Sequence, residues 1–183
     1  MYPVIISDPN NMEVTTMFRN KIELCDNLTA IFNEDRNMYL VKISWLGREI
    51  PVYLSTGFYD EDDEVEGLIK AFELFYEKKS ELLKKSQNDI KELLLPYIAT
   101  HEPKEGYLSF PKVTLDDFDA EYWLIEVAVL GGSDLDSDVD FYFDKLDNKE
   151  ASDEMLSVYR NIDGDYLDFY AGLANVTQED LGL

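Results

Sequence analysis

The sequence contains very few of the residues from which catalytic and metal-binding sites are commonly built. Its 183 residues include one cysteine, Cys25, and one histidine, His101. A single cysteine excludes a disulfide within the chain, and no cysteine or histidine spacing typical of zinc sites is present. No Ser-His-Asp or Cys-His arrangement can be assigned from spacing, and glycine-rich phosphate loops are missing. We therefore predict no enzymatic activity, no catalytic residue, no metal site and no cofactor.

Basic residues are scarce as well. Against 16 lysines and arginines stand 39 aspartates and glutamates, which gives a formal net charge of -23 at pH 7. Such a charge repels nucleic acids and anionic membranes and attracts basic proteins. The composition therefore predicts a basic protein as partner, with no nucleic acid and no membrane.

Long hydrophobic runs are a third absence. No stretch approaches the ~20 apolar residues of a membrane-spanning helix, and residues 1–9 lack the basic start of a signal peptide. We therefore expect a cytoplasmic protein. Hydrophobic residues still make up 45% of the chain and aromatic residues 13%, which is too much for a disordered chain. We predict one α+β domain over residues 26–183, preceded by an N-terminal arm or edge strand over residues 1–25.

Short links in the first half of the chain indicate an antiparallel meander. Residues 28–32, 38–45 and 49–54 have the composition and alternation of strands, and the turns between them allow only antiparallel neighbours. Pro51 lacks the N–H that a sheet ladder needs. We therefore expect the third strand to be an edge strand or to contain a bulge.

The middle of the chain has helical periodicity. The acidic stretch 60–66 stands where a helix begins, since carboxylates there favour the helix dipole, and apolar residues continue at helical spacing to residue 98. Ser86 and Asp89 have capping-box spacing, so a helical pair is predicted, although both residues fit inside one longer helix too. Pro96 should kink or end the second helix.

The second half predicts a four-stranded antiparallel segment. A Thr-x-x-Asp helix start at residues 114–117 leads into a strand over 122–130, and alternating strands follow at 138–144, 155–160 and 166–171. Alternation places large apolar side chains on one side of these strands. We expect four of them to be buried together, namely Trp123, Phe141, Phe143 and Phe169.

The other side of the same strands combines carboxylates with tyrosines. The candidate partner-binding residues are Asp138, Asp140, Tyr142, Asp144, Tyr159, Tyr166, Asp168 and Tyr170. Tyrosine provides rigid interface area, and negative charge accelerates the encounter with a basic partner. An acidic surface also simply keeps a protein soluble, and that alternative stays open.

An acidic run, residues 134–140, places oxygen ligands at alternate positions, as calcium loops do. An EF-hand loop needs glycine at its sixth position and glutamate at its twelfth, where this chain has Val139 and Lys145. We therefore favour a solvated turn and strand, with a divalent-cation site as the alternative.

The order of these elements resembles a bacterial domain of unknown function that occurs in small cytoplasmic proteins of the toxin-immunity type. The resemblance spans residues 30–171. Its motifs are Val41-Lys-Ile-Ser-Trp45-Leu-Gly47, Ile50-Pro-Val-Tyr-Leu54, Leu93-Leu94-Leu95, Val113-Thr-Leu-Asp-Asp-Phe118, the strand Asp138 to Asp144, and Asp163-Gly164 to Ala171-Gly172. That family has no established activity, so the resemblance implies no catalytic residue.

Charge, the acidic aromatic face and this resemblance favour an acidic protein-binding protein, an immunity-type inhibitor of a toxin that is itself basic and nuclease-like. Two alternatives are a DNA mimic that inhibits a nucleic-acid-binding protein and a divalent-cation-binding domain. Genomic context separates the first two, since a neighbouring toxin gene supports immunity and a prophage setting supports mimicry.

Overall fold

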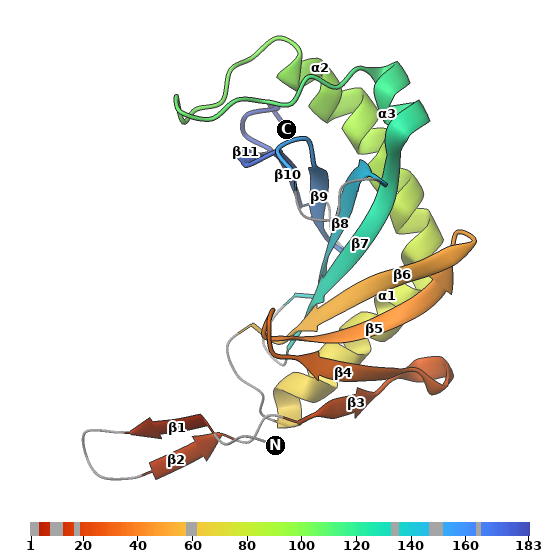
Figure 1. Cartoon of the computed structure of the whole chain (residues 1–183), viewed down its shortest axis with the longest axis vertical. Coiled ribbons are helices and arrows are strands. Elements are labelled where there is room, and N and C mark those ends of the chain that lie inside the picture. Colours follow the sequence, from red (N-terminus) through yellow and green to blue (C-terminus); the bar gives the residue numbers. More distant parts are fainter. Residues whose placement is uncertain are drawn as a thin grey trace.

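The computed structural model describes residues 4–7, 13–16, 19–57, 62–132, 136–146, 152–163 and 166–183 (Figure 1). The strands are β1 (Val4–Ser7), β2 (Glu13–Thr16), β3 (Lys21–Glu23), β4 (Thr29–Asn33), β5 (Met38–Trp45), β6 (Arg48–Ser55), β7 (Tyr122–Leu130), β8 (Asp138–Lys145), β9 (Leu156–Asn161), β10 (Leu167–Ala171) and β11 (Ala174–Val176). The helices are η1 (Cys25–Asn27), α1 (Asp62–Asp89), the π-helical η2 (Ile90–Leu94), α2 (Leu95–Ile98) and α3 (Leu115–Glu121).

One mixed sheet contains most of the strands. Its nine strands follow the order β11-β10-β9-β8-β7-β6-β5-β4-β3, and β1 pairs with β2 in a separate two-stranded sheet. All neighbours in the large sheet are antiparallel except β6 and β7, which are parallel. The α+β class is confirmed. The expected three-stranded and four-stranded segments are matched only loosely, because β3 extends the first, β11 extends the second, and the parallel pair joins both.

The expectation that the strand with Pro51 is an edge strand or contains a bulge is wrong, since its pairing with both neighbouring strands runs without a register shift. This strand, β6, lies inside the sheet between β5 and β7. Its pairing with β7 begins at Val52, one residue after the proline. The missing N–H of Pro51 therefore costs no hydrogen bond on the β7 side of the strand.

The helical middle is one long helix and not a pair. Ser86 and Asp89 both lie inside α1, and the helix continues without a break through the π-helical turn η2 into α2. The side chain of Ser86 is fully buried, so it does not stand at an exposed helix start. Pro96 lies in the first turn of α2, and the helix ends at Ile98, close to the end that the proline predicts.

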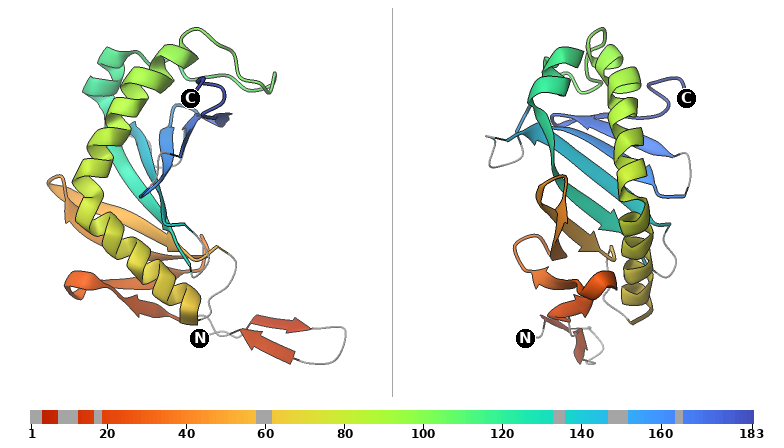
Figure 2. Two further views of the ribbon diagram at one scale, coloured as in Figure 1. Left: turned by 180° about the vertical axis from the view of Figure 1, so that it is seen from behind. Right: turned by 90° about the vertical axis from the view of Figure 1, so that its right-hand side faces the viewer.

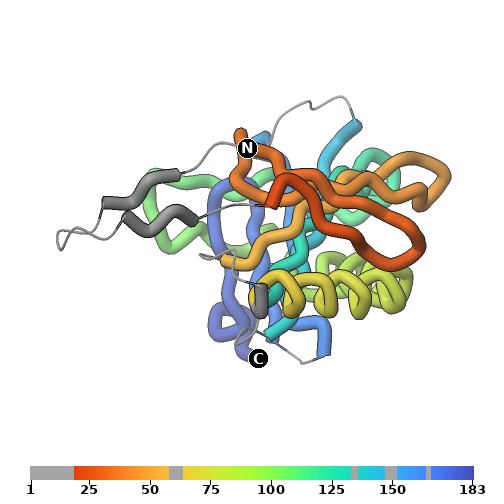
Figure 3. Tube along the Cα trace, turned by 90° about the horizontal axis from the view of Figure 1, so that it is seen from below, coloured from red at the N-terminus to blue at the C-terminus, as the bar shows by residue number. Residues whose placement is uncertain are grey.

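The core lies between α1 and the face of the sheet that α1 crosses, which we call the inner face (Figure 2). Phe75 of α1 contacts Phe141 of β8 at 6.2 Å and Trp45 of β5 at 6.3 Å between ring centroids. In Figure 3 the helix runs alongside the strands of the first half, and it also contacts β7 and β8. One helix therefore covers both halves of the sheet and connects the two parallel strands, as parallel pairing requires.

Glycines allow the helix to come close to the sheet. A Cβ atom on Gly67 of α1 would lie 2.3 Å from the backbone carbon of Gly132, just after β7. A Cβ atom on Gly131 would lie 2.5 Å from the side chain of Ala71. Side chains at these positions would hold α1 away from the sheet.

The burial of Phe141, Phe143 and Phe169 together is confirmed, but the expected burial of Trp123 is wrong. Trp123 is 50% exposed. The pairing of β7 with β8 shifts between Leu124 and Glu126, so β7 contains a bulge there. An extra residue reverses the alternation of side chains. Trp123 therefore faces away from the core.

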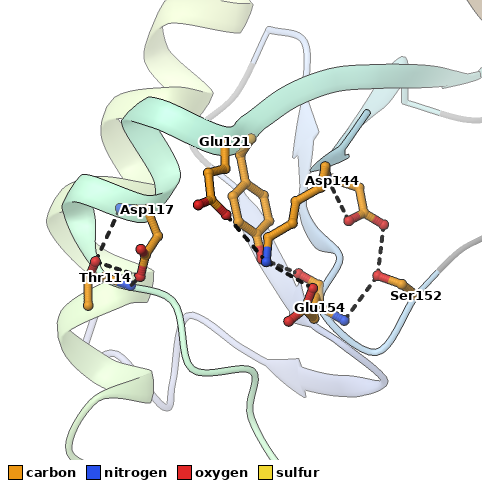
Figure 4. A network of polar contacts seen from close by, with 8 residues as sticks. Thr114, Asp117, Glu121, Asp144, Ser152 and Glu154 are labelled. Carbon is orange, nitrogen blue, oxygen red and sulfur yellow. Dashed lines mark hydrogen bonds and ion pairs between the residues drawn. The ribbon is translucent and has the colours of Figure 1, made fainter. Parts of the chain in front are cut away.

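The helix start predicted at Thr114 is confirmed. The backbone N–H of Asp117 donates to Thr114 Oγ1 at 3.1 Å, and the backbone N–H of Thr114 donates to the carboxylate of Asp117 at 2.9 Å (Figure 4). These reciprocal bonds form a capping box at the start of α3. Phe118 of this helix then packs against Phe143 at 5.7 Å between ring centroids.

Candidate functional site

Strand register brings the predicted partner-binding residues together on the face of the sheet opposite α1. We call the part of this face on β7 to β10 the outer face. Asp140, Tyr159 and Asp168 form one row across β8, β9 and β10. Glu126, Tyr142, Ser157 and Tyr170 form a second row, which begins on β7. The predicted carboxylates and tyrosines on this face are at least partly exposed; they are Asp138, Asp140, Tyr142, Tyr159, Tyr166, Asp168 and Tyr170.

Asp144 is the exception, and its assignment to an exposed surface is wrong. Its relative exposure is 0%. Its carboxylate accepts hydrogen bonds from the hydroxyl of Ser152 at 2.9 Å and from the backbone N–H of Lys145 at 2.7 Å (Figure 4). The ammonium of Lys145 lies 3.1 Å from the carboxylate of Glu154, so an ion pair also joins the end of β8 to the chain before β9. Asp144 therefore holds the chain before β9 in place.

Tyrosine hydroxyls donate hydrogen bonds to two carboxylates of the outer face. Tyr159 donates to Asp138 at 2.6 Å, and Asn161 donates to the other oxygen of Asp138 at 3.2 Å. Tyr166 donates to Asp168 at 2.6 Å. Burial, followed by the hydrogen bond to Asp138, raises the pKa of Tyr159, and the hydrogen bond to Asp168 raises the pKa of Tyr166. These pairs hold the aromatic rings in fixed positions.

Asp140 lies in a hollow of about 400 Å³ in the same face. Ser157 and Tyr142 lie beside the carboxyl group, and Met155, Tyr170 and Leu173 complete most of the lining. Within the described part of the chain, Asp140 Oδ1 and Ser157 Oγ are buried and have no hydrogen-bond partner in good geometry.

The protonation of Asp140 reflects this burial. Burial raises the pKa of the carboxyl to about 7, the nearby hydroxyls of Tyr142 and Ser157 lower it in part, and the charge of Glu126 raises it further. Burial, followed by the charge of Asp140, raises the pKa of Tyr142. A positive charge placed in this hollow would favour the ionised carboxylate.

A neighbouring part of the sheet already holds a guanidinium. Arg36, in the turn between β4 and β5, donates to the carboxylate of Glu126 at 2.8 Å. Its guanidinium also lies over the ring of Tyr53, 4.2 Å from the centroid. The hydrogen bond to Glu126 is the main cause that raises the pKa of Arg36. Arg36 thereby links the first half of the sheet to β7.

A second hollow of about 380 Å³ shares Tyr170 and Leu173 with the Asp140 hollow. It includes Lys104 and Asp180, whose ammonium and carboxylate are 2.5 Å apart. Asp180 of the second hollow is therefore already paired with a cation.

The other sequence candidates lie in different surroundings. His101 stacks on Tyr97 with 4.1 Å between ring centroids, and its Nδ1 lies 3.1 Å from the carbonyl oxygen of Tyr97. Asp134, the first residue of the calcium-like run, lies outside the described residues, as does the beginning of the acidic stretch at Asp60. Across the described ranges, no group of three or more histidine, cysteine, aspartate or glutamate side chains is placed to hold a metal ion.

Sequence reasoning missed several residues of this surface. Alternation does put Ser157 on the outer face, but nothing local distinguishes it from other strand serines. Arg36 and Glu126 are 90 positions apart and give no local signal of their contact. Met155 and Leu173 flank strands and become neighbours of Asp140 only through the pairing of β8, β9 and β10.

None of the known family models, curated proteins or solved structures that were compared matches this chain. None of the helices in the described part combines the length and the apolar character needed to cross a membrane.

Proposed function

We propose that this chain is an acidic, cytoplasmic protein-binding protein of the immunity type, which inhibits a basic, nuclease-like toxin through its outer face. The observation that carries the proposal is that carboxylate and tyrosine side chains lie in rows across β8, β9 and β10. Carboxylates there alternate with tyrosines that hydrogen bonds hold in place, as in Tyr159 with Asp138 and Tyr166 with Asp168. Rigid tyrosines lose little conformational entropy on binding, which suits an interface.

Charge complementarity supports a basic partner. The chain has a net charge of -23, and a field of that sign steers positively charged proteins into encounter. A basic nuclease matches this requirement, because its own substrate is a polyanion. The motifs that resemble toxin-immunity proteins point to the same class of partner.

The hydrogen bonds that tyrosine hydroxyls donate to the carboxylates favour a protein interface over DNA mimicry. A DNA mimic presents free carboxylates in place of phosphates, whereas Asp138 and Asp168 accept short hydrogen bonds from tyrosine hydroxyls. Exposed apolar area in the same place, on Tyr170 and Leu173, also suits side-chain packing.

The test uses the product of a toxin gene adjacent to the gene of this chain. Co-expression should restore growth of cells that produce the toxin, and the purified proteins should form a complex. Failure to bind the toxin at micromolar concentration, or to restore growth, would contradict the proposal.

Binding kinetics locate the interface. Asp168→Lys should slow association and weaken its salt dependence, since surface charge acts mainly on encounter. Glu73→Lys makes the same change of charge on the exposed surface of α1 and should leave both nearly unchanged. Tyr170→Ala should raise the dissociation rate, at a cost on the order of 2 kcal/mol if this exposed ring is an anchor. Equal effects of Asp168→Lys and Glu73→Lys would show that only net charge matters.

A further inference from the structure

The hollow at Asp140 contains two buried polar atoms, a carboxylate oxygen and a hydroxyl oxygen, without a well-aligned hydrogen-bond partner in the described part of the chain. Ser157 is only 1% exposed, and among the described residues neither its Oγ nor Asp140 Oδ1 has a partner in good hydrogen-bond geometry. The hydroxyls of Ser157 and Tyr142 still lie near enough to the carboxyl group to lower the pKa of Asp140 in part. Proteins seldom leave buried polar atoms unpaired, and such atoms often mark a place where a ligand or water completes the bonding. Both atoms line a hollow of about 400 Å³, which is within the usual size of ligand sites.

The lining specifies the chemistry of the missing group. An ionised carboxylate only accepts hydrogen bonds, so the ligand must donate at Asp140, and a positive charge would offset the cost of keeping that carboxylate ionised away from water. Tyr170, Met155 and Leu173 add aromatic and apolar surface to the walls. A guanidinium satisfies both requirements, because it is planar, carries several donors, is more weakly hydrated than an ammonium and packs on aromatic rings.

The sheet already holds one guanidinium in this manner. Arg36 donates to the carboxylate of Glu126 and lies over the ring of Tyr53. The Asp140 hollow repeats the combination of a carboxylate with tyrosine, in Tyr142 and Tyr170, but without a cation from the described residues. Glu126 and Tyr142 are paired across β7 and β8, so the occupied site and the hollow are neighbours in the same sheet.

We propose that the hollow formed by Asp140, Ser157 and Tyr170 binds the guanidinium of an arginine side chain that the partner protein presents. This inference rests on the proposed function, because it names the group by which the basic partner is anchored. Arginine is enriched among the residues that dominate protein interfaces, particularly where it enters a desolvated pocket.

Binding should depend on pH with a definite sign. Asp140 is surrounded by Tyr142 on its own strand, Glu126 on β7, Ser157 and Tyr159 on β9, and Arg36 beyond Glu126. Its pKa of about 7 means that the free hollow is protonated in acid and ionised in base. A guanidinium binds the ionised form, so its affinity should fall as the pH drops below about 7, and its binding should lower the pKa of Asp140.

The test titrates the whole chain with N-acetyl-arginine amide and follows backbone amides by NMR. N-acetyl-citrulline amide, which is uncharged and nearly isosteric, and N-acetyl-lysine amide serve as comparison probes. The arginine probe should shift amides of β8, β9 and residues 170–173 and bind about tenfold more tightly than the citrulline probe, the factor that corresponds to one good charged contact. The lysine probe should bind more weakly than the arginine probe. Equal binding of the arginine and citrulline probes, or shifts confined to other parts of the chain, would overturn the inference.

Two variants of equal charge locate the contact. Asp140→Asn should weaken the arginine probe about tenfold and abolish the pH dependence, whereas Asp168→Asn, a carboxylate on the same face but outside the hollow, should change the affinity less than about twofold. If both variants weakened the binding of the arginine probe equally, the loss would come from the change in net charge alone, and the inference would be overturned. If Asp140→Asn does not fold, the wild-type carboxyl carbon of Asp140 provides the readout. Its titration midpoint should move to lower pH when the arginine probe is added, and an unmoved midpoint would overturn the inference.

The outcomes separate this inference from the proposed function. Toxin binding without probe binding in the hollow would leave the immunity function standing and remove the arginine anchor. Probe binding without toxin binding would leave the guanidinium site standing and remove the immunity function.

Discussion

Replacing Phe141 by alanine should strongly destabilise the protein, because this side chain lies at the centre of the contact between the sheet and α1. Phe141 has no exposed surface, and its ring meets Phe75 of the helix at 6.2 Å between centroids. Its cross-strand neighbours, Val127 of β7 and Val158 of β9, are fully buried too. The substitution therefore leaves a cavity that the surrounding strands cannot fill without losing their register.

Large-to-small replacements of fully buried aromatic residues cost ~3 to 5 kcal/mol, and the rigid surroundings of Phe141 place it in this range. The proper control is Trp123→Ala. Half of the Trp123 side chain is already in water, at 50% exposure. Its truncation should therefore cost no more than about 1.5 kcal/mol, although tryptophan is the larger residue.

Urea denaturation followed by far-ultraviolet circular dichroism measures both variants. A lower midpoint with an unchanged slope would report a change in stability without a change in the surface exposed on unfolding. A cost below about 1.5 kcal/mol for Phe141→Ala, or a cost for Trp123→Ala equal to that for Phe141→Ala, would refute the assignment of the two residues to opposite faces.

Two further predictions concern the backbone approach of α1 and the charge of Asp140. Gly67→Ala should destabilise the protein although alanine favours helices, because its Cβ would lie 2.3 Å from the backbone of Gly132; Gly106→Ala, which has open space, should be nearly neutral by the same urea assay. Because the folded pKa of Asp140 is raised from 3.8 to about 7, the native state holds this proton more tightly, so the contribution of the group to stability falls as pH rises through that window. Asp140→Asn should therefore gain stability relative to wild type as the pH rises from 3.8 to about 7. An equal gain for Asp168→Asn, a variant on the same face, would contradict the burial of the Asp140 charge.

Local patterns determined much of the secondary structure. Alternation along β8 predicted that Phe141 and Phe143 point inward, and both are buried. Side chains on a strand point to opposite sides in turn whatever the strand pairs with, so this inference needs no tertiary information. The capping box at Thr114 and Asp117 is local in the same sense, since its hydrogen bonds join residues three positions apart.

Contacts between distant residues determined the remaining features. The bulge after Leu124, which turns Trp123 outward, appears only when β7 is aligned with β8. Asp144 has the alternation of an outer-face residue, but it is fully buried and accepts a hydrogen bond from Ser152, eight positions along the chain. A single strand cannot show either effect, because each depends on which other segment lies beside it.

Composition by itself determined that the chain is strongly acidic and poor in cysteine and histidine, since these are counts. The tertiary structure determined where that acidity has chemical consequences. Asp140 became distinct from the other carboxylates because β8, β9 and β10 bring Ser157 and Tyr170 beside it and bury one oxygen of its carboxyl group. Burial changes the energy of a charge far more than its position in the sequence does, and burial exists only after the strands have paired.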